Sequence, residues 1–343
     1  MMSLKYPWLL VASLLATGAG GNAFAQTSKD DPLFIYQWHL QNTGQAVIGD
    51  ARPVAKVDLD LTDLHARNIR GNGVIVGVVD DGLEIRHEDL AGNVVPGGSK
   101  NFVDGSNDPT PVNGNDEHGT AVTGIIGAVG WNGKGGRGVA PEARLKGFNF
   151  LSKDVDGLDT NQDTNIRYSW GNGLESKDVA VYNNSWGSVL RSYPAISLAE
   201  QGSWEKLMQS TRKGKGGIYV KAAGNNFNNH QVFFGLIELC TDQAKSLKVS
   251  CVSSSTDPFN NFIGTITVAA VNAKGVRSSY SSAGASIWVS GIGGEFGVQK
   301  AYFPDLSNIA DFAKPTYYDP AIVTTDLSGC ARGSNADRKD GTV

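Results

Sequence analysis

Three residues of this sequence combine a reactive side chain with a position that can present it to a partner. Asp80 follows an apolar run and precedes Asp81 and Gly82, so its carboxylate is placed to orient another group. His118 opens a stretch of small residues that is typical of a helix, which gives its ring a rigid base. Asn225 comes shortly after another apolar run, where a carboxamide can donate a hydrogen bond to a developing oxyanion.

Each of these signals also has a simple structural explanation. Asp and Gly after a strand commonly form a turn, Asp116 or Thr120 can cap a helix with His118 incidental, and an Asn can adopt a left-handed turn conformation. No His-Glu-x-x-His or Gly-x-Ser-x-Gly sequence occurs, so neither a helical zinc site nor a nucleophile elbow is supported. The Gly-x-Gly-x-x-Gly sequence that begins at Gly133 does not lie between a strand and a helix, as a dinucleotide site requires.

The elements that must position these residues predict an α/β fold with a mostly parallel sheet. The run Gly73–Val79 is continuous and bounded by Gly-Asn-Gly and Asp-Asp-Gly, as in a strand buried on both faces. Sites in such sheets gather beyond the carboxyl ends of the strands. Further strands are predicted over 143–151, 179–182, 218–222 and 266–271. Helices are predicted over 120–128 and 195–212, the latter with Leu198, Trp204, Leu207 and Met208 on one face. Residues 226–262 are predicted to form a long irregular insertion.

The composition favours a globular protein with a large core. Of 343 residues 40% are hydrophobic and 19% charged, and 30 Lys and Arg against 34 Asp and Glu give a net charge of −4. These values disfavour a disordered chain and a polybasic nucleic-acid binder, so no nucleic-acid partner is expected.

Residues 1–25 have the layout of a secretory signal. Lys5 precedes the apolar run Trp8–Ala16, and a small-residue stretch ends in Ala-Phe-Ala at residues 23–25. The apolar run is too short to span a bilayer, so a secreted or periplasmic protein with no membrane span is expected. We divide the remainder into an N-terminal mature segment over 26–70 and a larger domain over 71–343. Cys240 and Cys251 are expected to form a disulfide, which leaves Cys330 over.

The order of the motifs resembles the subtilase superfamily of serine peptidases (peptidase S8), and most closely its kexin-like branch. Val-Val-Asp-Asp-Gly, His-Gly-Thr, Ser-Trp-Gly and Ala-Ala-Gly-Asn follow one another in the family's order, and the similarity runs from about Asp31 to Gly297. The resemblance implies a subtilisin-like fold with helices on both faces of the sheet. It implies that Asp80 orients His118, that His118 is the general base, and that Asn225 is the oxyanion donor.

The resemblance also implies substrate and metal sites. Ser185, Trp186 and Gly187 match the extended segment that pairs with the backbone of a peptide or protein substrate and walls the first specificity pocket. Asp81 is an acid near the second subsite. A calcium ion is expected at carboxylates, an amide and backbone carbonyls contributed by Asp31, Asp89, Val129, Asn132, Lys134 and Gly136.

The sequence departs from the family at the nucleophile. The family serine stands in Gly-Thr-Ser-x-x-x-Pro, whereas the Gly-Thr pairs at Gly119, Gly264 and Gly341 continue with Ala, Ile and Val. We therefore expect a chain truncated before this motif, with an incomplete C-terminal part and no appreciable hydrolysis as written. The alternative is a non-catalytic secreted homologue that binds peptides. Ser188, Val189 and Leu190 follow Ser-Trp-Gly where kexin-type enzymes carry acids, so a preference for Arg or Lys is not predicted.

Overall fold

The structure is a computed structural model that describes residues 30–152, 162–187, 196–232, 236–302, 305, 314–329 and 331–334. The predicted signal at 1–25, Cys330 and residues 188–190 lie outside this set. Within it, no helix is both long and apolar enough to cross a bilayer.

A seven-stranded parallel sheet forms the centre of the molecule. Its strand order is β2-β3-β1-β4-β5-β8-β9, and every pairing is parallel. The five predicted strands are confirmed with small shifts at their ends, whereas β2 and β9 were not predicted because they are short or largely exposed. The strands are β1 (Ile75–Asp80), β2 (Lys100–Asn101), β3 (Arg144–Asn149), β4 (Val181–Asn184), β5 (Ile218–Ala222), β8 (Thr265–Val271) and β9 (Ile287–Ile292).

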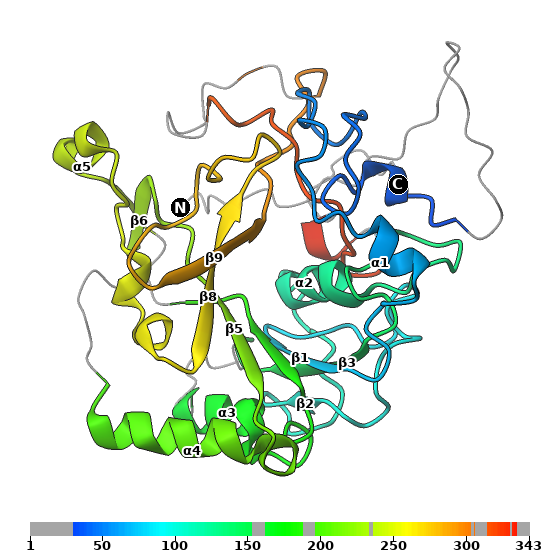
Figure 1. Cartoon of the computed structure of the whole chain (residues 1–343), viewed down its shortest axis with the longest axis vertical. Helices are drawn as coiled ribbons and strands as arrows, with labels where there is room; N and C mark the ends of the chain where they lie inside the picture. Colours follow the sequence, from blue (N-terminus) through cyan, green and yellow to red (C-terminus); the bar gives the residue numbers. More distant parts are fainter. Residues whose placement is uncertain are drawn as a thin grey trace.

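Each face of the sheet carries its own apolar core, because successive side chains of a strand point to opposite faces. Val79 and Phe148 pack on one face with Trp170 and Trp204. Val76 and Leu145 pack on the other face, against α2. Figure 1 shows α2 on one side of the strands and α3 and α4 on the other, as the predicted fold class requires. Among the described residues, the helical elements outside the 226–262 insertion are the turn Phe34–Tyr36, α1 (Thr62–Ala66), α2 (His118–Gly127), α3 (Gln162–Arg167), the π-helical turn Tyr168–Asn172 and α4 (Leu198–Gly214).

Helix α4 confirms the predicted helix but not all of its predicted apolar face. Trp204 and Met208 are buried and Leu207 packs against the same core, whereas Leu198 is 85% exposed. Ser197 caps the helix in a capping box with Glu200, so Leu198 is the first helical residue. Leu198 is therefore outside the core that Trp204, Leu207 and Met208 join, and its position on the helical face did not predict this exposure.

The insertion over 226–262 is more regular than predicted. It contains the antiparallel pair β6 (Asn229–Val232) and β7 (Leu236–Leu239), the helix α5 (Asp242–Leu247), and single turns at Ser254–Thr256 and Pro258–Asn261. The last three elements each begin at a Thr, Ser or Asp whose side chain caps the turn, which is why short segments without a long apolar run still fold. The predicted disulfide between Cys240 and Cys251 is confirmed.

Candidate active site

Asp80 and His118 meet although they are far apart in the chain. Asp80 is the last residue of β1 and its side chain is buried, while His118 is the first residue of α2. The Nδ1 atom of His118 lies 2.8 Å from Oδ1 of Asp80. The close approach depends on Gly119, because a Cβ atom there would overlap the carbonyl oxygen of Gly82 and lie 3.0 Å from Cβ of Asp80. The predicted partnership of this carboxylate and imidazole is therefore present in the structure.

The electrostatics of the pair favour a charged imidazole. The Asp80 carboxylate raises the pKa of His118 from 6.5 to about 9, against the opposing effect of burial. The carboxylate is inside the protein, whereas 56% of the His118 side chain is exposed. Because Nδ1 faces Asp80, Nε2 is the ring nitrogen that can exchange a proton with a substrate group.

Asp81 holds the start of α2. Its carboxylate accepts hydrogen bonds from the backbone N–H groups of Gly119 at 2.6 Å and His118 at 3.2 Å. Burial, and then the neighbouring charge of Asp80, raise the pKa of Asp81 to about 7. Asp81 thus positions the backbone that carries the imidazole, while its contact with a substrate stays a prediction.

Asn225 reaches the same edge of the sheet through the strand order. Strand β4 pairs with β1 on one side and β5 on the other, so the carboxyl ends of all three strands lie together. At about 4.8 Å between neighbouring strands, the ends of β1 and β5 are roughly 10 Å apart. The exposed Asn225 follows Gly224, whose carbonyl accepts from the N–H of Ser282 at 2.9 Å. Its direct approach to a substrate oxygen stays a prediction.

The segment Ser185–Gly187 continues from β4 at this edge. The indole Nε1 of Trp186 donates to the carbonyl of Val79 at 3.0 Å, and its ring packs against Phe150 with centroids 5.0 Å apart. The Trp186 side chain therefore anchors the segment inward, while Gly187 is exposed. This placement suits a segment that offers its backbone to an extended peptide.

The structure brings the residues predicted to bind calcium into one loop cluster. The two carboxylate oxygens of Asp89 accept from Nδ2 of Asn132 at 2.7 Å and from the N–H of Gly136 at 3.2 Å. The backbone N–H of Val129 donates to the carbonyl of Asp89, and that of Lys134 donates to Oδ1 of Asn132. These residues therefore share one place in the fold.

The two carboxylates of this cluster differ in their charge compensation. Asp31 is buried and paired with Arg137, whose Nε lies 2.7 Å from Oδ2. Asp89 is also buried, and within the described residues it forms no ion pair. Burial raises the pKa of Asp89 to about 7, as expected for a carboxylate without a cation beside it. The groups that contact the Asp89 carboxylate are N–H donors, from the amide of Asn132 and the backbone of Gly136. Calcium binding at this cluster stays a prediction.

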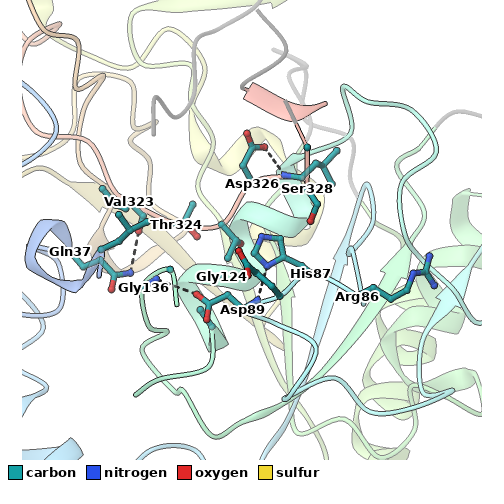
Figure 2. A pocket seen from close by; sticks show the side chains of 17 residues that line it. Gln37, Arg86, His87, Asp89, Gly124, Gly136, Val323, Thr324, Asp326 and Ser328 are labelled. Atoms are coloured by element: carbon teal, nitrogen blue, oxygen red, sulfur yellow. Dashed lines mark hydrogen bonds between the residues drawn. The ribbon is translucent and has the colours of Figure 1, made fainter. Parts of the chain in front are cut away.

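A separate cavity of 420 Å³ lies between this loop cluster, α2 and residues 323–329. Figure 2 shows Asp89, His87 and Asp326 around it, and neither Asp80 nor His118 lines it. The cavity is therefore distinct from the candidate catalytic edge.

Sequence reasoning missed two charged residues at the candidate catalytic edge. Lys221 of β5 and Asp257 form a buried ion pair beside Trp186. The signal was a lysine inside the apolar run Ile-Tyr-Val-Lys-Ala, since lysine is almost never buried without a partner.

Comparison with known proteins agrees with this geometry. Residues 71–317 match the model of the subtilase family, Peptidase_S8. The chain is 41% identical over 307 residues to the Aeromonas extracellular serine protease of Aeromonas sobria, with 89% of this chain and 45% of that protein covered. It is 31% identical over 256 residues to kexin of Saccharomyces cerevisiae, with 74% and 27% covered.

A solved structure shows the same similarity in three dimensions. The crystal structure of the Aeromonas sobria serine protease in complex with the chaperone ORF2 matches with a TM-score of 0.76 and 39% identity, covering 89% of this chain and 47% of that one. This chain spans less than half the length of these relatives. The family match extends over most of the chain and includes both Asp80 and His118. The chain belongs to the subtilase family of serine peptidases.

Proposed function

We propose that this chain carries the substrate groove and the acid–base pair of a secreted serine endopeptidase. The observation that carries the proposal is the 2.8 Å contact between the buried Asp80 carboxylate and Nδ1 of the exposed His118 ring. In this arrangement the neutral form of the His118 ring takes the proton of a serine hydroxyl at Nε2 and later gives it to the leaving amine. Asp80 keeps the ring in the required tautomer and stabilises its cation, and Asn225 donates to the oxyanion.

The proposed triad needs a serine in addition to these groups. The 343 residues contain no Gly-Thr-Ser sequence. We expect the chain as written to bind an extended peptide along Ser185–Gly187 without cleaving it, because loss of the nucleophile lowers kcat about 10⁶-fold in enzymes of this type. The absence of that motif is also the observation that favours the second candidate, a secreted peptide-binding homologue without catalysis.

Export and calcium binding complete the proposal. The layout of residues 1–25 supports export, and the relative from Aeromonas sobria is described as extracellular. Asp31, Asp89 and Asn132, with backbone carbonyls of Val129, Lys134 and Gly136, are the proposed calcium-binding residues. A bound calcium ion would supply positive charge to the buried Asp89 and would connect the N-terminal segment, through Asp31, to the loop after α2.

The coding sequence and active-site labelling distinguish the enzyme from the binding protein. An in-frame Gly-Thr-Ser codon sequence downstream of codon 343 supports the enzyme, and its absence supports the binding protein. For the product that contains the serine, we expect labelling by a fluorophosphonate probe and cleavage of a fluorogenic peptide. Both should be lost in His118→Ala. Cleavage that survives His118→Ala would refute the proposed mechanism.

A further inference from the structure

Lys221 is buried where the proposed peptide groove begins. It is the penultimate residue of β5, and its side chain is 0% exposed. Its Nζ atom lies 2.9 Å from Oδ2 of Asp257, whose own side chain is 6% exposed. Burial of a lysine is costly, because the ammonium group loses its water. The contact with Asp257 opposes the effect of burial, which by itself lowers the pKa of Lys221.

Asp257 is held in place by a second, local interaction. Its Oδ1 atom accepts a hydrogen bond from the N–H of Phe259 at 2.9 Å and caps the turn Pro258–Asn261. One carboxylate oxygen therefore fixes the side chain, and the other faces Lys221. The ion pair has a defined geometry rather than that of two flexible surface groups.

Lys221 also contacts the substrate-binding segment. Its Nζ atom donates to the carbonyl oxygen of Trp186 at 2.5 Å and lies 4.4 Å from the centroid of the Trp186 ring. The register of the sheet explains this contact, because Lys221 pairs with Asn184, two residues before Trp186. The ammonium group thus connects β5 to the segment that leaves β4.

The ion pair lies directly beside Gly187. A Cβ atom built on this glycine would lie 3.0 Å from Oδ2 of Asp257 and 3.3 Å from Nζ of Lys221. A peptide paired with Ser185–Gly187 would therefore place a side chain close to both charges.

We propose that Lys221 is a positioning and specificity-determining residue, which holds the Trp186 carbonyl and neutralises Asp257 beside the peptide groove. This inference rests on the proposed function. Carbonyl groups alternate in direction along an extended chain. When the Trp186 carbonyl accepts from Lys221, the carbonyls of Ser185 and Gly187 therefore point to the opposite side, where a peptide can pair with them. The second effect is electrostatic: Asp257 paired with Lys221 attracts a cationic peptide side chain less than the same carboxylate without this ammonium group would.

The test compares two fluorescein-labelled hexapeptides that differ only in having Arg or Leu at the residue expected beside Gly187. Binding is measured by fluorescence polarisation, which needs no catalytic serine. In Lys221→Met the length of the side chain is kept and the charge is lost. We expect the ratio of Arg-peptide to Leu-peptide affinity to rise at least about tenfold, the low end for close charge pairs in a desolvated interface.

Two matched variants make the result independent of folding defects in Lys221→Met. Asp257→Asn leaves the ammonium group without its carboxylate, so the same affinity ratio should fall below that of the wild type. The double variant Lys221→Met/Asp257→Asn has neither charge and should return the ratio to near the wild-type value. It also lacks the donor to Trp186, so both peptides should bind it more weakly than they bind the wild type.

The outcomes separate this inference from the proposed function. If the wild type binds the peptides and the affinity ratio is the same in all variants, the role of Lys221 is refuted while the groove stands. If the double variant binds both peptides as tightly as the wild type, the positioning role is refuted. If the wild type binds neither peptide, the proposed peptide groove itself is wrong, and the inference fails with it.

Discussion

Replacing Asp80 by Asn tests the electrostatic basis of the candidate site. Asn keeps the shape of the side chain and an oxygen that can accept from Nδ1 of His118, so the substitution removes mainly the charge. The neighbouring carboxylate is the largest cause of the raised pKa of His118. In Asp80→Asn we therefore expect this pKa to fall from about 9 toward 6.5.

The expected loss of unfolding free energy follows from the size of the pKa shift and from the exposure of the His118 ring. A change of 9 − 6.5 = 2.5 pKa units corresponds to about 3.4 kcal/mol at 1.36 kcal/mol per unit. Since 56% of the His118 side chain is exposed, water screens the interaction, and we expect roughly 1–2 kcal/mol to be realised.

The sign of the pH dependence follows from the direction of the shift. A histidine whose pKa is higher in the folded state stabilises the fold fully below its unfolded pKa of 6.5, and this contribution is lost as the pH rises through about 9. The wild type should therefore exceed Asp80→Asn in unfolding free energy by roughly 1–2 kcal/mol more at about pH 6 than at about pH 10.

The primary assay is NMR titration of the His118 ring, supported by urea unfolding at the two pH values. The ring is read directly because Asp81, whose pKa is also raised by Asp80, contributes to the pH dependence of stability. His87 is an internal control, since its pKa is lowered by burial and Asp80 is not among the groups that shift it. A His118 pKa that stays near 9 in Asp80→Asn would refute the assigned cause.

Three further perturbations test the rest of the site. In the serine-containing product, Asn225→Ala should lower kcat about 10²–10³-fold with little change in KM, because an oxyanion donor acts mainly in the transition state. Steady-state kinetics measure both constants, and an unchanged kcat would exclude that role. Calcium at about 100 times its dissociation constant should add about 2.7 kcal/mol to the unfolding free energy and raise Tm by about 4 °C, and Asp89→Asn should abolish the rise. Identical melting curves with calcium and with chelator would rule out the metal site. Replacing Cys240 by Ser removes the disulfide to Cys251, 11 residues away in the sequence, and the unfolding free energy measured in urea should fall by about 3 kcal/mol. An unchanged unfolding free energy would show that this bond does not constrain the unfolded chain.

The boundaries of the strands show how far local patterns can be read. The predicted strand 218–222 coincides with β5, because both its ends are marked by a change to Gly or small residues. The first strand was predicted to end at Val79, where the apolar run stops. It includes Asp80, because this residue still pairs with Asn149 of β3. Pairing with a distant strand extended the element beyond its apolar pattern.

For the candidate site, too, local patterns identified some residues and missed others. The motifs identified Asp80, His118 and Asn225 as separate candidates, and their order indicated the family. The Lys221–Asp257 pair was missed. A lysine inside an apolar run indicates that a partner is needed, but nothing local identifies Asp257, 36 positions away in the sequence, as that partner. The exposure of Leu198 was also missed, since it depends on which residues of α4 pack against the core.

By itself the sequence determined the class of fold, most of the strands of the sheet, the disulfide and the identity of the catalytic candidates. These properties depend on hydrophobic periodicity, capping residues and short motifs, which act over a few residues. The tertiary structure decided which side chains meet. Parallel pairing and the packing of α2 on β1 bring Asp80 to His118, and the neighbouring positions of β4 and β5 bring Lys221 to Trp186. Such contacts depend on how whole elements pack, because distance in a folded chain does not follow separation in sequence.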